Sequence, residues 1–103
     1  MKAISIKQPW ADQIIFGNKK IEYRSWPTSR RGDVLICASK KSEPGTCASA
    51  VTGHAIGIIE IFDCTGNRED GFEWHLRNPR PIKPFRVKGK LNFFEVELPE
   101  WKA

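Results

Sequence analysis

Alternating hydrophobic and polar positions predict a chain made mostly of short strands. An apolar residue at every second position is typical of a strand buried on one face, and a continuous apolar run is typical of a strand buried on both faces. Residues 33–39 form such a run, and residues 54–63 carry five large apolar side chains. Strands are therefore predicted at residues 3–7, 20–25, 33–39, 54–63, 72–76 and 93–98.

A short helix is predicted between the first two strands. Pro9 suits the first turn of a helix, where a missing N–H costs little. Gly17 is expected to end the helix in a left-handed conformation. Four apolar residues recur between them at helical spacing and are expected to share one buried face: Trp10, Ala11, Ile14 and Ile15.

The segments between these elements are polar or rich in residues that interrupt secondary structure. Residues 40–53 predict a surface loop, and residues 64–71 predict a polar connection. Residues 78–84 contain three prolines, so this segment is expected to be extended and not to form a central strand. Five or six strands with one or two short helices in 103 residues indicate one small α+β domain, residues 1–103, with a barrel-like sheet.

Composition narrows the class of protein further. The net charge of +5 and the pI of about 9.3 are compatible with a polyanionic partner such as nucleic acid. No apolar run approaches the length of a membrane span, and the N-terminus is too short and too charged for a signal peptide, so a cytoplasmic protein is expected. The three cysteines form no CxxC pair, so no metal site, cofactor or disulfide framework is expected.

The first candidate site combines Lys19, Glu22 and Arg24. Glu22 and Arg24 are two residues apart on a predicted strand and therefore point to the same face, while Ile21 and Tyr23 point to the other. Lys19 lies at the strand entry. Such a group can hold a phosphate, or it can position a carboxylate as an acid, a base or a reader of a base edge. The alternative is a solvated strand face with a weak surface ion pair.

Two further candidate regions carry polar and aromatic side chains. Gln8 and Trp10 flank the predicted helix start, where free N–H groups favour anions; the alternative is that Trp10 anchors the core. A later stretch interleaves the rings of Trp74, His75 and Phe85 with cations, a mixture that suits single-stranded nucleic acid. The cations are Arg77, Arg80, Lys83, Arg86, Lys88 and Lys90. Its alternative is a solvated segment whose charge serves solubility.

The order of these pieces resembles the ASCH domain, a member of the PUA-like superfamily. The resemblance is carried by the stretch "KQPW", then by G-x-K-x-x-E-x-R-S-W from Gly17 to Trp26, then by "RG" and a strand that ends in "AS". The later stretch "GFEWHLRNPRPIKPFRVKGKLNFFEVEL" is similar to the C-terminal half of small bacterial and phage-type ASCH proteins. The resemblance therefore covers nearly the whole chain.

This resemblance implies a PUA-like β-barrel with a cleft beside the helix-to-strand junction. Lys19, Glu22 and Arg24 would line the cleft, and Gln8 and Trp10 would lie at its rim. The roles proposed for the family centre on RNA, so the expected partner is RNA, a nucleotide or a nucleoside, with no membrane partner and a monomeric chain. The expected binding residues are Gln8, Trp10, Lys19, Glu22, Arg24, Trp26, Arg31, Ser39, Trp74, Arg77, Arg80 and Lys83.

Two other classes of function stay open. Some family members hydrolyse acylated cytidine with a lysine and a threonine of this motif, and others are ribonucleases. The lysine corresponds to Lys19, but Glu22 stands in the threonine position, so a hydrolase would have to use Glu22 as a base on water, with Lys19 beside it. The aromatic content also permits a protein-interaction domain with no nucleic-acid role.

Overall fold

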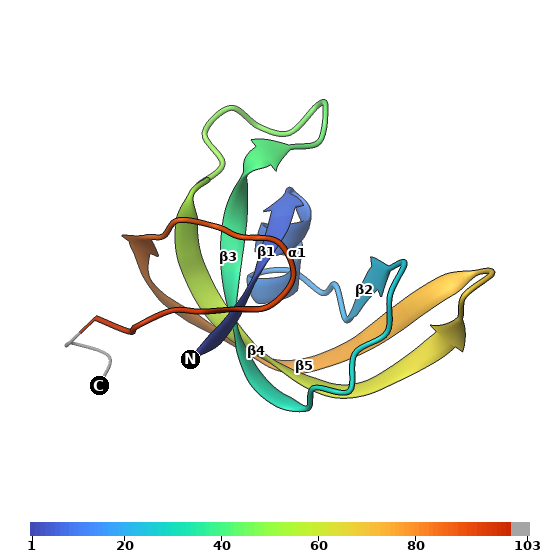
Figure 1. The fold of residues 1–103 in the computed structure, drawn as a ribbon. Helices are drawn as coiled ribbons and strands as arrows, with labels where there is room; N and C mark the ends of the chain where they lie inside the picture. The colour runs from blue at the N-terminus through green and yellow to red at the C-terminus, as the bar shows by residue number, and fades with distance from the viewer. Residues whose placement is uncertain (100–103) are drawn as a thin grey trace.

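A computed structural model describes residues 1–99 and shows one mixed sheet of six strands with a short helix packed against it (Figure 1). The number of strands and the α+β class confirm the prediction from the sequence. In chain order the elements are β1 (Lys2–Gln8), α1 (Trp10–Ile15), β2 (Ile21–Arg24), β3 (Gly32–Ser42), β4 (His54–Asn67), β5 (Gly71–Arg86) and β6 (Phe94–Glu95).

The strands lie in the order β2-β5-β4-β3-β1-β6. β1 runs parallel to β3, and every other neighbouring pair is antiparallel. The long strands β4 and β5 curve strongly, and the sheet bends round so that β2 comes to lie opposite β1 (Figure 1). The sheet does not close, because β2 pairs only with β5. The result is an open barrel rather than a closed one, and its gap between β1 and β2 is called the seam below.

Helix α1 packs into the curve of the sheet. Ala11, Ile14 and Ile15 are buried there, and the apolar face that the helical spacing predicts is confirmed for these three residues. A glycine in β4 makes the close approach possible, because a Cβ on Gly57 would lie 2.7 Å from carbons of Ile15. Trp10 differs from the prediction: it is 38% exposed, since the helix turns this first residue towards solvent.

The other face of the sheet carries a second apolar cluster. Its buried members are Ala3, Leu35, Cys37, Ala55, Ile82 and Phe94. Strand β3 is buried on both faces between Val34 and Ala38, as its continuous apolar run predicts. The first cluster contains α1 and the inward side chains of the same strands, so β3 holds the two parts of the core together.

Several predicted boundaries are wrong. The polar segment 64–71 is not a long connection, because β4 continues to Asn67 and β5 begins at Gly71. β3 continues to Ser42, which shortens the predicted loop. The predicted strand 93–98 contains only the two residues of β6. Gly17 does not adopt a positive φ; its N–H donates to the Gln13 carbonyl and continues the helical turn.

The proline-rich segment 78–84 lies within β5. In the first part of β5, residues 72–75 pair with both β2 and β4, whereas the later residues pair with β4 alone. Three register shifts interrupt the ladder between β4 and β5. The prolines thus lie where β5 forms an edge of the sheet, which agrees with the expectation that they cannot occupy a central strand.

Candidate functional site

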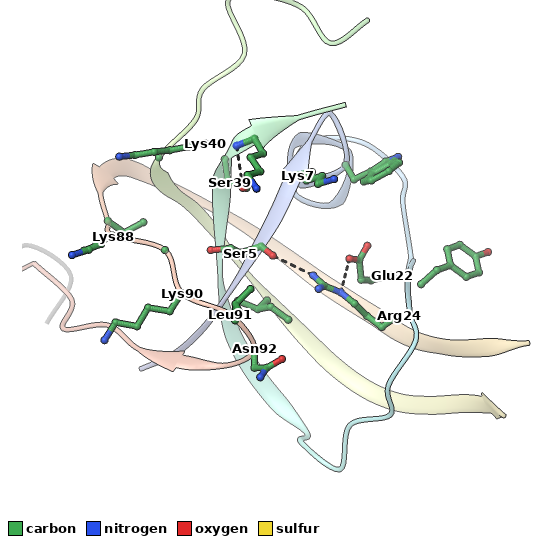
Figure 2. Close-up of a pocket in the computed structure, with 18 residues that line it drawn as sticks. Ser5, Lys7, Glu22, Arg24, Ser39, Lys40, Lys88, Lys90, Leu91 and Asn92 are labelled. Carbon is green, nitrogen blue, oxygen red and sulfur yellow. Dashed lines mark hydrogen bonds and ion pairs between the residues drawn. The ribbon is translucent and has the colours of Figure 1, made fainter. Parts of the chain in front are cut away.

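A cleft of about 790 Å³ lies at the seam. One wall comes from β1 and the start of α1, and another comes from β2. The end of β3 and the segment 87–92, which follows β5, complete it (Figure 2). The cleft therefore lies where the sheet is open, between β1 and β2.

Arg24 joins β2 to β1 at the base of the cleft. Its Nε donates a hydrogen bond to Glu22 Oε2 at 3.0 Å, and its Nη2 donates to the Ser5 carbonyl oxygen at 3.2 Å (Figure 2). The guanidinium also lies 5.7 Å from the centre of the buried Trp74 ring. These three contacts fix Arg24 in place, so it orients Glu22 rather than standing free for a ligand.

Glu22 is a largely buried acid in a cleft that is otherwise basic. Only 7% of the residue is exposed. Burial raises the pKa of Glu22 above its ordinary value, and this effect exceeds the opposing influence of Arg24 and Lys19. No described residue donates a hydrogen bond to its other oxygen, Oε1. Glu22 thus offers one carboxylate oxygen to the cleft and retains a proton more readily than a solvated glutamate.

The alternation predicted for β2 is confirmed, and the charged face points inward. Tyr23 is 64% exposed, whereas Glu22 and Arg24 lie at the base of the cleft. Lys19 lies beside this group, with its Nζ 5.1 Å from the centre of the Tyr23 ring, and does not itself line the cleft. The arrangement excludes the solvated strand face that the sequence left open, because Glu22 is buried.

Cations outnumber acids around the cleft. Its charged lining consists of one acid, Glu22, and six cations: Lys7, Arg24, Lys40, Lys41, Lys88 and Lys90. Arg24 pairs with Glu22, and Lys7 lies 3.6 Å from Glu43. The other four lysines form no ion pair with any residue that the structure describes. Their charge is therefore available to an anionic ligand.

The segment 87–92 crosses the cleft as a strap that is fixed at both ends. At one end the Val87 N–H donates to the Gly53 carbonyl at 3.1 Å. At the other end Phe93 stacks on Trp74, with ring centres 5.5 Å apart. Between them Gly89 passes so close to β1 that a Cβ there would lie 2.7 Å from the Ser5 hydroxyl. The strap thereby brings Lys88 and Lys90 to the cleft.

Four residues predicted from the sequence line the cleft: Trp10, Glu22, Arg24 and Ser39. Three others lie beneath it. The Gln8 side chain is fully buried; its amide N donates to Asp12 and to the Val51 carbonyl. Trp74 is 1% exposed and donates its indole N–H to the Trp26 carbonyl, and the two rings pack edge to face. Gln8 and Trp74 therefore support the cleft and present no face to a ligand, and the half-buried Trp26 packs against Trp74.

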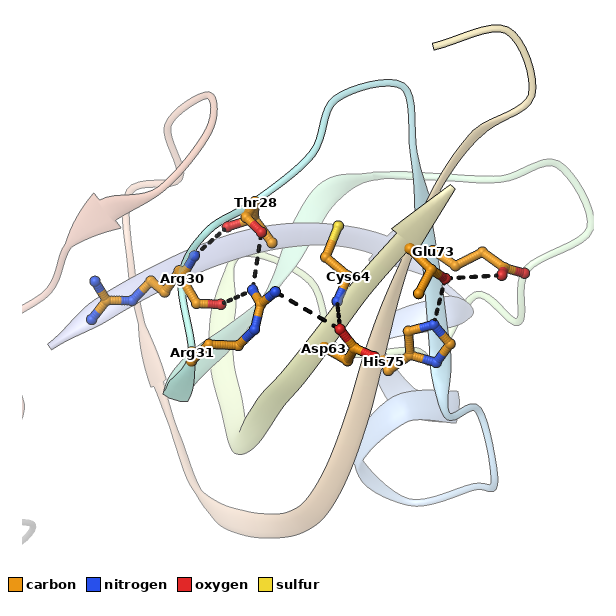
Figure 3. A network of polar contacts seen from close by, with 8 residues as sticks. Thr28, Arg30, Arg31, Asp63, Cys64, Glu73 and His75 are labelled. Atoms are coloured by element: carbon orange, nitrogen blue, oxygen red, sulfur yellow. Dashed lines mark hydrogen bonds and ion pairs between the residues drawn. The ribbon is translucent and has the colours of Figure 1, made fainter. Parts of the chain in front are cut away.

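The predicted basic residues of β5 do not meet at the cleft. Arg77 pairs with Glu60, and Arg80 pairs with Asp33. Lys83 is exposed and lines no part of the cleft. Arg31 also lies elsewhere: Figure 3 shows its guanidinium directed towards Thr28, Arg30 and Asp63. Partners from β4, β3 and the loop before β3 occupy these arginines, which sequence spacing alone does not reveal.

Two cleft lysines, Lys40 and Lys41, were not predicted from the sequence, whereas Lys88 and Lys90 belong to the predicted basic stretch. Lys40 and Lys41 follow Ser39 directly, and Lys88 and Lys90 flank Gly89. The signal that could have indicated Lys40 and Lys41 is the pair of lysines directly after the "AS" strand end, and the signal for the other two is the alternation of lysine around Gly89. Neither indicates which distant segment the lysines face, because the contact between the strap and β1 is long-range.

Three further features of the described part of the chain concern metal binding, thiol reactivity and membrane crossing. Among these residues no group of three or more His, Cys, Asp or Glu side chains is placed to hold a metal ion. Burial raises the pKa of the Cys37 thiol to about 12, so this cysteine is a core residue. Within residues 1–99 no helix has the length and apolar character needed to cross a membrane.

Comparison with known proteins identifies relatives. The family model described as the ASCH domain matches residues 4–100. Activating signal cointegrator 1 of Homo sapiens is 45% identical over a region that covers 64% of this chain and 15% of the human protein, and its Mus musculus counterpart is 26% identical over the same shares. This chain therefore corresponds to a small part of these relatives.

Solved structures resemble the fold. The crystal structure of ASCH from Zymomonas mobilis matches with a TM-score of 0.68 and 14% identity, and the match covers 93% of this chain and 87% of that one. A tyrosine-to-phenylalanine variant of the same protein gives a TM-score of 0.68 over 93% of this chain and 89% of that one. At this identity the likeness supports the fold alone.

Proposed function

This chain belongs to the ASCH domain family, and from that premise we propose that its cleft binds single-stranded RNA or a nucleotide. The observation that carries the proposal is the charge around the cleft, where six cations face one acid. Four of those cations have no acidic partner among the described residues, and unpaired cations in a concave site attract phosphate.

Different residues of the cleft contact the phosphate groups, the base edge and the base ring. Lys40, Lys41, Lys88 and Lys90 bind phosphate oxygens. Glu22 Oε1 accepts a hydrogen bond from an N–H of the base, while Arg24 keeps the carboxylate in position. Trp10 lines the cleft with a partly exposed ring, on which a base can stack. The stacking role falls to Trp10 because Trp74 is buried and Trp26 packs against it.

An RNA titration at several salt concentrations tests the proposal. The cleft variant Lys41→Gln/Lys90→Gln is compared with Lys20→Gln/Arg68→Gln, which alters two exposed cations outside the cleft and lowers the net charge equally. The cleft variant is expected to bind on the order of tenfold more weakly at low salt and to show a shallower salt dependence, by about 0.7 per lost contact. Equal losses in both variants would contradict a cleft-specific role. A third variant, Lys83→Gln, shows whether the proline-rich stretch contributes.

A second candidate function is hydrolysis of RNA or of a modified nucleoside. The observation in its favour is the raised pKa of Glu22, a buried carboxyl in the cleft whose Oε1 has no hydrogen-bond partner among residues 1–99. In this reading Glu22 accepts a proton from an attacking water, and Lys19 stabilises negative charge nearby. Glu22→Gln is the test, with the RNA and nucleosides analysed after incubation. If Glu22→Gln retains turnover, this hydrolase proposal is wrong. The proposal that the cleft binds RNA or a nucleotide would still stand.

A further inference from the structure

A second pocket of about 720 Å³ adjoins the cleft and is more uniformly basic than the cleft itself. Three cations and a histidine line it, and no aspartate or glutamate among residues 1–99 does. The cations are Lys40, Arg86 and Lys88, the histidine is His54, and Thr52, Gly53 and Val87 complete the lining. None of the three cations forms an ion pair with a described residue. Arg77 and Arg80, by contrast, each form an ion pair with a neighbouring acid.

The two pockets share a wall. Lys40, Gly53, Val87 and Lys88 line both of them. Figure 2 shows Lys40 and Lys88 extending to the side away from Glu22 and Arg24. The stem of Lys40 lies over Gly53, where a Cβ would be 3.5 Å from two of its carbons, and Gly53 has a φ of +69° that favours glycine. A ligand that leaves the cleft between Lys40 and Lys88 therefore enters the second pocket directly.

The sheet holds the polar groups of this pocket in a fixed arrangement. Arg86 and His54 lie directly opposite each other on the antiparallel strands β5 and β4. The backbone below is tied across strands, with the Gly53 N–H donating to the Ala38 carbonyl at 2.8 Å. His54 Nδ1 donates to the Thr52 carbonyl at 2.8 Å, which fixes the orientation of the ring. The pocket is thus preformed and does not depend on loop closure.

We propose that this second pocket binds the phosphate adjacent to the nucleotide held in the cleft. The inference rests on the proposed function of the cleft and specifies its ligand as an oligonucleotide rather than a free nucleoside or mononucleotide. Arg86 supplies the forked guanidinium that suits a phosphate, and Lys40 and Lys88 carry the backbone from one pocket to the other. A mononucleotide lacks the adjacent phosphate that this proposal assigns to Arg86.

Arg86→Gln tests this inference, with Arg68→Gln as the control for charge. Arg86 is exposed and makes no ion pair with a described residue, so the variant is expected to fold normally, as circular dichroism would show. Binding is measured for uridine 5′-monophosphate, diuridylate and hexauridylate at low and moderate salt. Arg86→Gln is expected to weaken hexauridylate about five- to tenfold, to lower the salt slope by about 0.7, and to leave the monophosphate unchanged. Arg68→Gln is expected to alter neither ligand.

The outcomes separate this inference from the proposed function. If the wild type binds hexauridylate and Arg86→Gln behaves like Arg68→Gln, the second pocket is not a subsite and the cleft proposal stands. If Arg86→Gln weakens the monophosphate as much as hexauridylate, Arg86 belongs to the nucleotide site and the inference of a separate phosphate position is overturned. If the wild type binds none of these ligands, the proposed function fails, and the second pocket loses its premise with it.

Discussion

Arg24 donates hydrogen bonds to both sides of the seam, to Glu22 on its own strand and to the Ser5 carbonyl on β1. Both side chains of the ion pair are mostly shielded from solvent, with 23% of Arg24 and 9% of Glu22 exposed. One guanidinium therefore links β2 to β1 across the seam, where the two strands form no backbone ladder. It stabilises the cleft while leaving the strands apart.

Arg24→Ala is expected to destabilise the protein by about 2–3 kcal/mol, because it leaves a buried carboxylate without its partner and breaks the link to β1. The double variant Arg24→Ala/Glu22→Gln should recover part of the loss, since a neutral amide costs less to bury than an unpaired charge. Urea denaturation of the wild type, the two single variants Arg24→Ala and Glu22→Gln, and the double variant measures the coupling free energy between the two side chains. Additive losses would mean that the two side chains do not stabilise each other.

The raised pKa of Glu22 predicts how stability depends on pH. The folded protein binds this proton more tightly than the unfolded chain, for which the ordinary value is 4.5. The stabilisation of the folded state by protonated Glu22 is fully present below the unfolded pKa of 4.5. It is lost as the pH rises through the pKa of Glu22 in the folded protein. Glu22→Gln lacks the titration, so its stability relative to wild type should increase from about pH 4 upward and then level off. Urea denaturation at several pH values above 4 gives the free energy of unfolding of both proteins. If Glu22 were solvated, the difference between the two would not change with pH.

Cys47 should react with a thiol reagent well before Cys37 does. Cys47 is exposed, and a hydrogen bond from Ser49 lowers the pKa of its thiol. Cys37 is buried, with a pKa raised to about 12, and is expected to react only after unfolding. Mass spectrometry of the native protein at increasing times gives the order. Ser49→Ala is the matched variant and should slow modification of Cys47 alone; early labelling of Cys37 would contradict the double burial of β3.

Gly57→Ala is expected to destabilise the protein by about 1–3 kcal/mol, because the added methyl group meets Ile15 at 2.7 Å. The double variant Gly57→Ala/Ile15→Ala tests the cause. Truncation of Ile15 removes the clash, so the double variant should lose less stability than the sum of the single variants. Thermal unfolding of all four proteins provides the comparison. If the loss in the double variant equals the sum of the two single losses, then Gly57 and Ile15 are not in contact. The helix α1 would then lie further from β4 than the structure shows.

Local patterns predicted the elements of this fold well, and long-range contacts explain where they failed. The continuous run in β3 and the alternation in β2 were sufficient to predict a buried strand and a charged face. The same patterns could not show that the face of Glu22 points into the protein, because that depends on β2 curving round to β1. Likewise, spacing placed Arg77 and Arg80 beside Trp74 in sequence, but pairing with β4 and β3 gave each arginine an acidic partner and left Trp74 in the core.

The roles of Trp10 and Trp74 provide the sharpest test of how the cleft meets a base. Trp10 lines the cleft and is 38% exposed, whereas Trp74 is 1% exposed between Trp26 and Phe93. Trp10→Ala should therefore weaken RNA binding about tenfold or more, by loss of stacking, with little change in stability. Trp74→Phe should lower stability by about 1–3 kcal/mol, because it removes a buried ring and the hydrogen bond to Trp26.

Binding is measured under conditions in which both of these variants remain folded, so that stability and affinity are read separately. A Trp74→Phe protein that is folded but has lost RNA affinity, beside a Trp10→Ala protein that binds normally, would reverse the two assignments. It would also require the aromatic cluster beneath the cleft to open when RNA binds, because Trp74 can reach a base only if Phe93 and the strap that it fixes move away.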